Sequence, residues 1–161
     1  MGLTATLFLD VDGVLSPIRG PTGEWDDWEE APYQDYFLVL SRSMARRLAE
    51  LPVAVVWLTT WRQQANTHSG RWLGWKAHRV IDPGYEGGAD RWKVAAVRAH
   101  IEDGGGPFVW IDDDLDVMAP QVAPLVANHR HLLVAPNPVI GLTRHDLERV
   151  EGFLLSLEDA G

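Results

Sequence analysis

Short apolar runs, each closed by turn residues, alternate with helical patterns along this chain of 161 residues. The runs are continuous rather than alternating in polarity, which is typical of parallel strands covered on both faces. The predicted strands are residues 4–11, 53–59, 79–82, 107–111 and 131–135. Helical spacing of apolar residues predicts helices over 41–51, 89–102 and 143–157. This order favours an α/β fold, a doubly wound Rossmann-like parallel sheet of about five strands with helices on both faces.

Length and composition narrow the class of protein further. The length suits one domain over residues 1–161. The absence of cysteine excludes a disulfide framework, a cysteine-ligated zinc site and a thiol nucleophile. No apolar run approaches the roughly 18–20 residues of a membrane span, so we expect no membrane partner and a cytoplasmic location. The sequence gives no indication of an oligomeric state.

Charge bears on the partners of the protein. Because the net charge of −9 repels a polyanion, we expect no long, nonspecifically bound nucleic acid as a partner. Residues 62–98 nevertheless carry seven basic and three acidic side chains. An anion-binding region in this part of the chain therefore stays open as a hypothesis.

The strongest signal for chemistry lies where the first apolar run ends. Asp10 and Asp12 lie one residue apart there, and Gly13 follows them. Ligands of open α/β sheets bind outside the carboxyl ends of the strands. Carboxylates crowded at such an end repel each other unless a cation or a proton lies between them. We therefore predict a site here, with Gly13 providing the turn that brings the acids together.

The second strand also ends in polar residues. The run over 53–59 ends in Thr59, which is followed by Thr60 and Arg62. A hydroxyl and backbone N–H groups at a strand end form an anion site. Strand propensity alone also explains a threonine at this place.

A second acidic cluster follows the predicted strand over residues 107–111. The run over 107–111 ends in Asp112, Asp113 and Asp114. Consecutive aspartates at a strand end need counter-charge, most simply a divalent metal with oxygen ligands. The positive end of a helix dipole would account for one or two of these acids without a metal.

In this order the motifs resemble the haloacid dehalogenase-like (HAD) phosphohydrolase superfamily. The first family motif, hhhDxDG, is similar to Leu7–Gly13, and the last, hhhDD, is similar to Trp110–Asp113. The second family motif ends an apolar strand in Thr or Ser, which Thr59 matches and Thr60 matches as the alternative. The resemblance spans most of the chain.

The remaining family motif is a lysine upstream of the last acidic motif. Lys93 matches it best, with Lys76 and Arg62 as rival cations. Residues 137–143 and the helix after them resemble a small group of HAD domains associated with RNA-repair proteins.

The resemblance implies an aspartyl-phosphate mechanism that uses Mg²⁺. Asp10 is the expected nucleophile, and Asp12 is the expected general acid and base. The expected metal ligands are Asp10, the Asp12 backbone carbonyl, Asp112 and Asp113. Thr59 and Lys93 are expected to hold phosphoryl oxygens. We expect further substrate contacts from Gly13, Thr60 and Arg62.

The spacing of the motifs leaves no room for a large cap domain. Between Asp12 and Thr59 the chain holds one helix and an irregular flap over about 14–37. Three tryptophans are expected in the core: Trp57, Trp92 and Trp110. Three others either stack on a substrate or anchor the flap: Trp25, Trp28 and Trp61. The expected site is therefore open, with a short flap beside it.

The expected function is hydrolysis of a phosphomonoester, with nucleotides or nucleic-acid ends as leading substrates. A phosphatase of a small metabolite or a phosphoprotein would use the same residues. A binding domain that keeps the HAD fold without turnover is the alternative of another class.

Overall fold

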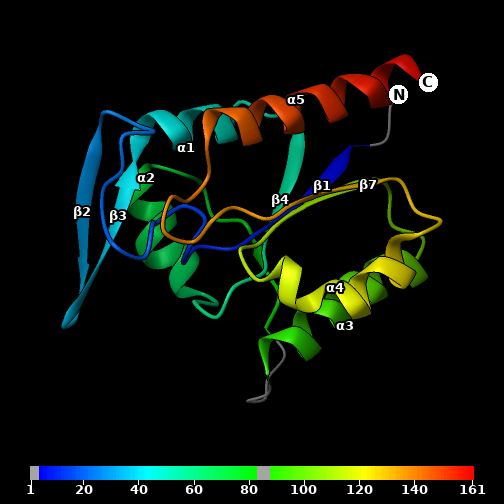
Figure 1. Ribbon diagram of the computed structural model, residues 1–161, viewed down its shortest axis with the longest axis horizontal. Coiled ribbons are helices and arrows are strands. Elements are labelled where there is room, and N and C mark those ends of the chain that lie inside the picture. The colour runs from blue at the N-terminus through cyan, green and yellow to red at the C-terminus, as the bar shows by residue number, and fades with distance from the viewer. Residues whose placement is uncertain (1–3, 83–87) are drawn as a thin grey trace.

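The computed structural model describes residues 4–82 and 88–161, and a five-stranded parallel sheet forms its centre (Figure 1). The strands are β1 (Ala5–Leu9), β4 (Val53–Trp57), β5 (Arg79–Val80), β6 (Phe108–Ile111) and β7 (His131–Val134). They pair in the order β5-β4-β1-β6-β7, with β1 in the middle. Every predicted strand is present and is shorter than its apolar run, because the ends of the runs continue into loops.

Helices cover both faces of this sheet. They are α1 (Arg42–Ala49), α3 (Ala89–Glu102), α4 (Leu115–Val126) and α5 (Arg144–Asp159). Figure 1 shows α1 and α5 on one face and α3 and α4 on the other. Side chains of β1 alternate between two cores, since Leu7 and Leu9 pack with α1 and α5 while Phe8 packs with α3 and α4. The fold is therefore the doubly wound α/β arrangement that the sequence predicts.

Helix α4 is a helix that the sequence pattern did not predict. Pro120 and Pro124 lie inside it, and proline removes a backbone donor and normally breaks a helix. Both prolines lie on the exposed face, where water can satisfy the freed carbonyl groups. The buried face of α4 carries four apolar side chains at helical spacing: Leu115, Met118, Val122 and Val126. Burial of this face outweighs the local preference of the two prolines.

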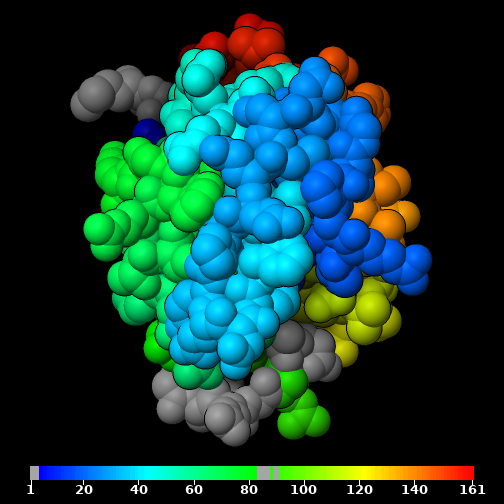
Figure 2. All heavy atoms as spheres, turned by 90° about the vertical axis from the view of Figure 1, so that its left-hand side faces the viewer, coloured from blue at the N-terminus to red at the C-terminus, as the bar shows by residue number. Residues whose placement is uncertain are grey.

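The expected flap over 14–37 is more regular than predicted. Its second half and the residues after it form an antiparallel hairpin of β2 (Trp28–Tyr33) and β3 (Tyr36–Ser41). Leu38 and Leu40 of β3 join the core beneath α1 and α5, and this burial favours a strand over an irregular loop. Figure 2 shows the hairpin spread across one side of the molecule, beside the segment that follows β4. That segment contains η1 (Ala65–Gly70) and α2 (Arg71–Leu73).

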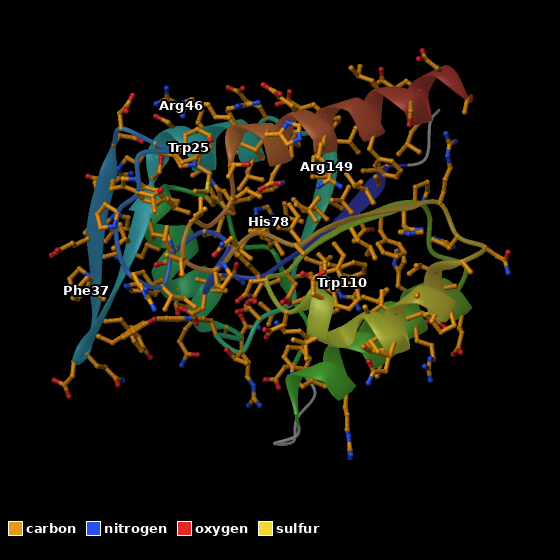
Figure 3. All side chains as sticks on the ribbon, in the orientation of Figure 1. Trp25, Phe37, Arg46, His78, Trp110 and Arg149 are labelled. Atoms are coloured by element: carbon orange, nitrogen blue, oxygen red, sulfur yellow. The ribbon has the colours of Figure 1, made fainter. Side chains whose placement is uncertain are left out.

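The tryptophans expected in the core are buried there. Trp57 and Trp110 are fully buried and Trp92 is nearly so. Figure 3 shows Trp110 beside α4, whereas Phe37 lies out on the hairpin, where it is more than half exposed. Within the described ranges, no helix is long and apolar enough to cross a membrane.

Asp27 joins the start of the hairpin to the start of α1. Its Oδ1 accepts the Ser41 hydroxyl at 2.6 Å, and its Oδ2 accepts the backbone N–H of Ser43 at 2.8 Å. Partial burial works to raise the Asp27 pKa, but the hydrogen bonds from Ser41 and Ser43 outweigh it and hold the pKa below the ordinary 3.8. Ser41 in turn caps α1 by accepting the N–H of Met44.

Replacing Asp27 by alanine is expected to lower the free energy of unfolding by about 1–2 kcal/mol, because it removes this clamp. A carboxyl whose pKa is lower in the folded state stabilises the fold above its unfolded pKa. The difference between wild type and Asp27→Ala should therefore shrink as the pH falls below about 4. Urea unfolding at several pH values measures this, and Asp26→Ala, at the exposed neighbour, is the control. A difference that stays constant down to pH 2.5 would contradict the assignment.

Candidate active site

The site forms where the three central strands end at the same level. Leu9 is in register with Trp57 on one side and with Ile111 on the other. The next residue along β1 is Asp10, and the next along β6 is Asp112. Since Phe8 and Trp110 point toward α3 and α4, alternation along the strands directs Asp10 and Asp112 to that same face.

Lys93 of α3 lies between these two carboxylates. Its Nζ is 2.6 Å from Oδ2 of Asp112 and 3.2 Å from Oδ2 of Asp10. All three side chains are buried, with Lys93 only 2% exposed. Burial works to lower the Lys93 pKa, but the charges of Asp10 and Asp112 outweigh it and raise the pKa above its usual value. Lys93 is therefore a buried cation, and of the three candidates that the sequence leaves open it is the one that lies between Asp10 and Asp112.

The second oxygen of each carboxylate accepts a backbone N–H group. Oδ1 of Asp10 accepts from Val11 at 2.8 Å, and Oδ1 of Asp112 accepts from Asp114 at 2.9 Å. Both side chains are thus fixed from two directions. Such fixed carboxylates are preorganised for a ligand at the sheet edge.

Asp113 completes a cluster of three carboxyl groups with Asp10 and Asp112. Burial and the nearby charge of Asp10 raise the pKa of Asp112 to about 6, against the opposing effect of Lys93. Burial and the charges of Asp10 and Asp112 raise the pKa of Asp113 to about 7. One lysine therefore leaves an excess of negative charge at this edge of the sheet.

Gly13 gives Asp113 the space that it occupies. Its φ of +72° lies in the left-handed region that glycine adopts without strain. A Cβ at this position would lie 2.5 Å from Oδ2 of Asp113 and 3.0 Å from Cβ of Pro138. The first motif thus needs glycine here both for the turn and for the close approach of the last motif.

Asp12 is held by two aromatic side chains from different segments. Its Oδ1 accepts the Tyr36 hydroxyl at 3.0 Å, and its Oδ2 accepts the Trp61 indole N–H at 2.7 Å. Burial and the Asp12 charge raise the Tyr36 pKa, so this hydroxyl stays a donor. The hairpin and the loop after β4 therefore orient the second aspartate together.

The residues after β4 take up different positions. Thr59 is fully buried, and its hydroxyl accepts the Trp61 backbone N–H at 3.3 Å. Thr60 is exposed and lines a hollow beside Asp12. Arg62 has a φ of +52° and lies 3.7 Å from Asp82 in an ion pair. The sequence predicts that Thr59, Thr60 and Arg62 contact the substrate phosphate. In the structure the three residues belong to the same turn after β4.

The three tryptophans whose role the sequence left open differ in their hydrogen-bond partners. Trp25 is buried and donates to the Leu142 carbonyl at 2.9 Å, and Trp28 donates to the Thr22 carbonyl at 2.7 Å. Both therefore anchor the flap, and Trp61 is the one that reaches Asp12. The contact of Tyr36 with Asp12 could not be predicted from the sequence, since it depends on the register of a hairpin that the sequence did not predict.

The sequence matches the model of the family described as "HAD domain in Swiss Army Knife RNA repair proteins" over residues 6–147. The chain belongs to this HAD family. The matched range contains every strand of the main sheet and all the carboxylates of the site. No curated protein and no solved structure matches the chain.

HAD domains generally use a metal ion, and the carboxylates of this one fit such an ion. One oxygen from each of Asp10, Asp112 and Asp113 lies within 4.8 Å of the other two. Carboxylate oxygens are the ligands that hard divalent cations prefer. The raised pKa values of Asp112 and Asp113 reflect the same excess of negative charge, which a bound cation would offset.

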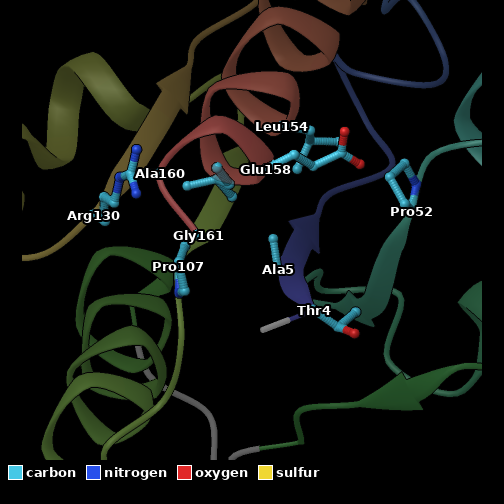
Figure 4. Close-up of a pocket in the computed structure, with 10 residues that line it drawn as sticks. Thr4, Ala5, Pro52, Pro107, Arg130, Leu154, Glu158, Ala160 and Gly161 are labelled. Atoms are coloured by element: carbon cyan, nitrogen blue, oxygen red, sulfur yellow. The ribbon is translucent and has the colours of Figure 1, made fainter. Parts of the chain in front are cut away.

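A separate cavity of this HAD domain lies at the opposite edge of the sheet (Figure 4). It has a volume of about 570 Å³ and is bordered by residues that precede the strands: Thr4, Pro52, Pro107 and Arg130. Ligands of doubly wound sheets bind at the carboxyl ends of strands rather than at these amino ends. We therefore expect the chemistry of the domain at the acidic edge rather than in this cavity, although this cavity is larger than the hollow beside Asp12.

Replacing Gly13 by alanine is expected to cost about 1–3 kcal/mol of unfolding free energy, because an L-residue is strained at this φ. The new Cβ should also displace the Asp113 carboxylate and weaken the binding of any divalent cation at the three carboxylates. Urea unfolding and a Mg²⁺ titration followed by thermal shift measure the two effects. Gly23→Ala is the matched control, since a Cβ there meets nothing within 4 Å. Unchanged stability and Mg²⁺ response in Gly13→Ala would contradict the packing argument.

Proposed function

We propose that this HAD domain is a Mg²⁺-dependent phosphomonoester hydrolase that works through an aspartyl-phosphate on Asp10. The observation that carries the proposal is the buried Lys93 between Asp10 and Asp112, at the carboxyl end of the sheet. A buried ion pair is costly to assemble and adds little to stability. A purely structural role therefore explains poorly why Lys93 is buried between two carboxylates. Reaction with an anionic phosphate is a better reason, because Lys93 then offsets charge where the phosphoryl group arrives.

The first proposed step transfers the phosphoryl group to the protein. A carboxylate oxygen of Asp10 attacks phosphorus, and the bond from phosphorus to the leaving oxygen breaks. Asp12, in its protonated form, donates its proton to that leaving oxygen, which departs as an alcohol. Lys93 stays beside the attacking carboxylate throughout and limits the build-up of negative charge.

The second proposed step restores the protein. Water attacks the phosphorus of the aspartyl-phosphate, and Asp12 takes up the proton that the water loses. The bond from phosphorus to Asp10 breaks, so inorganic phosphate leaves and the carboxylate is regenerated. Thr59, or Thr60 beside it, would hold a phosphoryl oxygen through its hydroxyl in both steps.

Mg²⁺ would be held by Asp10, the Asp12 backbone carbonyl, Asp112 and Asp113, and when bound it would withdraw charge from the phosphoryl oxygens. Nucleotides or nucleic-acid ends are the substrates we favour, because the family is described from RNA repair proteins. A small phosphorylated metabolite or a phosphoprotein remains the competing substrate class.

Replacing Asp10 by asparagine is expected to reduce hydrolysis of an aryl phosphate at least about a thousandfold, because the nucleophile is lost. Chelation of Mg²⁺ in the wild type should have a comparable effect, reversed by added Mg²⁺. Steady-state phosphate release with and without chelator measures both. Asp116→Asn, on the exposed surface of α4, is the control that changes an acid outside the cluster. Turnover retained in Asp10→Asn would overturn the nucleophile assignment.

The contact between Tyr36 and Asp12 gives a second prediction. Tyr36→Phe removes one of the two donors that orient the Asp12 side chain, so Asp12 should be less well aligned with the leaving oxygen to which it gives its proton. We expect kcat to fall about tenfold for an alkyl phosphate and less than about twofold for p-nitrophenyl phosphate, whose leaving group needs no proton. Comparing kcat for the two esters checks this. An equal loss for both esters would show that Tyr36 acts only through the fold.

A further inference from the structure

A hollow of about 480 Å³ opens beside Asp12, between the hairpin tip and the loop after β4. From the hairpin it is lined by Tyr33, Gln34, Asp35 and Tyr36. From the loop it is lined by Thr60, Trp61 and Gln64. We propose that this hollow is the leaving-group subsite of the enzyme and that it takes the neutral nucleoside part of a phosphomonoester. The proposal rests on the proposed function, since that function assigns Asp12 to the leaving oxygen.

The position of the hollow identifies the part of the substrate that it would hold. Asp12 is one of its lining residues, and the group that gives a proton to the leaving oxygen must contact the leaving group. The phosphoryl group itself belongs at Asp10 and Lys93, which do not line the hollow. A substrate that reaches both places therefore has its phosphate at the sheet edge and the rest of the molecule against the hairpin.

The charge of the lining favours a neutral leaving group. Asp12 and Asp35 are acidic, and among the residues that the structure describes no lysine, arginine or histidine lines the hollow. A second phosphate or a carboxylate in this place would meet repulsion without a compensating cation. A sugar with a base, which carries no charge, meets none.

The aromatic side chains favour a planar group. Tyr33 and Trp61 have ring centroids 5.2 Å apart at an interplanar angle of 61°, so they form two differently inclined walls. His68 stacks on Trp61 at 5.5 Å and 17° and supports that ring from outside the hollow. The indole is fixed further by its hydrogen bond to Asp12. Rings held in advance lose little entropy when a base stacks on them.

The polar side chains separate a nucleobase from a plain aromatic ring. Gln34 and Gln64 each offer an amide, and Asp35 and Thr60 offer further hydrogen-bonding groups. The edge of a base carries donors and acceptors that such groups pair with, whereas the edge of a phenyl ring carries none. The ring of a phosphotyrosine would therefore contact the aromatic walls of the hollow, but the polar side chains of the hollow would stay without a hydrogen-bond partner.

The test compares kcat/KM for substrates that differ in one part. Nucleoside 3′- and 5′-monophosphates are compared with ribose 5-phosphate, which lacks the base, and with O-phosphotyrosine. We expect a nucleotide to exceed ribose 5-phosphate by about thirtyfold, which corresponds to stacking of one base. A 3′-phosphorylated and a 5′-phosphorylated dinucleotide form a further arm, which separates free nucleotides from nucleic-acid ends. Equal rates with and without the base, or a preference for phosphotyrosine, would overturn the subsite.

Variants locate the preference in the hollow. Tyr33→Ala should reduce the ratio of nucleotide to ribose 5-phosphate about tenfold, mainly through KM for the nucleotide, because it removes one wall. Gln64→Ala, at an exposed position, should reduce the ratio about threefold while keeping the fold. Phe37→Ala is the matched control, an exposed hairpin aromatic that does not line the hollow, and its ratio should stay within twofold of wild type. A ratio that Tyr33→Ala and Gln64→Ala both leave unchanged would overturn the assignment.

A binding measurement distinguishes failure of this subsite from failure of the proposed function. Uncharged nucleosides are titrated into the wild type while the Trp61 indole resonance is followed by NMR, with Trp61→Phe to assign it, and the phosphatase activity of the same wild-type protein is measured in parallel. A shift of this resonance without any phosphatase activity would support the subsite and contradict the proposed function. Phosphatase activity with no shift at saturating nucleoside would support the function and contradict the subsite.

Discussion

The buried contact of Lys93 with Asp10 and Asp112 is the interaction on which the rest of the structure depends. Two strands of the sheet end in carboxylates at the same level, so their carboxyl groups are forced together. Removal of the lysine would leave two carboxylates buried without a counter-charge. Breaking a buried ion pair in this way costs about 3–5 kcal/mol of unfolding free energy. Helix α3 must therefore cross the sheet where its fifth residue meets both acids. This contact thus ties α3 to the ends of β1 and β6, in addition to the apolar side chains that α3 and α4 bury against the sheet.

Much of the fold could be predicted because its strands are buried on both faces. Continuous apolar runs such as 53–59 and 107–111 carry that signal without any knowledge of neighbours. The hairpin and α4 could not be predicted in the same way. Pro120 and Pro124 argue locally against a helix, and Leu38 and Leu40 reveal a strand only once the core that they enter is known. In each case tertiary burial overrides the local preference.

The site divides along the same line. Asp10, Asp12 and Asp112 could be picked out from sequence, because acids directly after apolar strands must share one edge of a parallel sheet. Lys93 needed the family resemblance, since a lysine in a helix is most often on the surface. Tyr36 and the role of Trp61 lay beyond both kinds of reasoning. Their contacts with Asp12 depend on the register of the hairpin and on the left-handed turn at Arg62.

The two cores of the molecule have a consequence for how such a domain can diversify. Hairpin residues Ala31, Leu38 and Leu40 belong to the core shared with α1 and α5, whereas the helix that carries Lys93 packs in the core on the other face. The sheet separates the two cores, and substitutions that share no contacts have nearly additive effects on stability. Evolution can therefore reshape the hairpin to accept new molecules, provided that the contact of Tyr36 with Asp12 is kept, while the ion pair of Lys93 on the other face of the sheet stays intact.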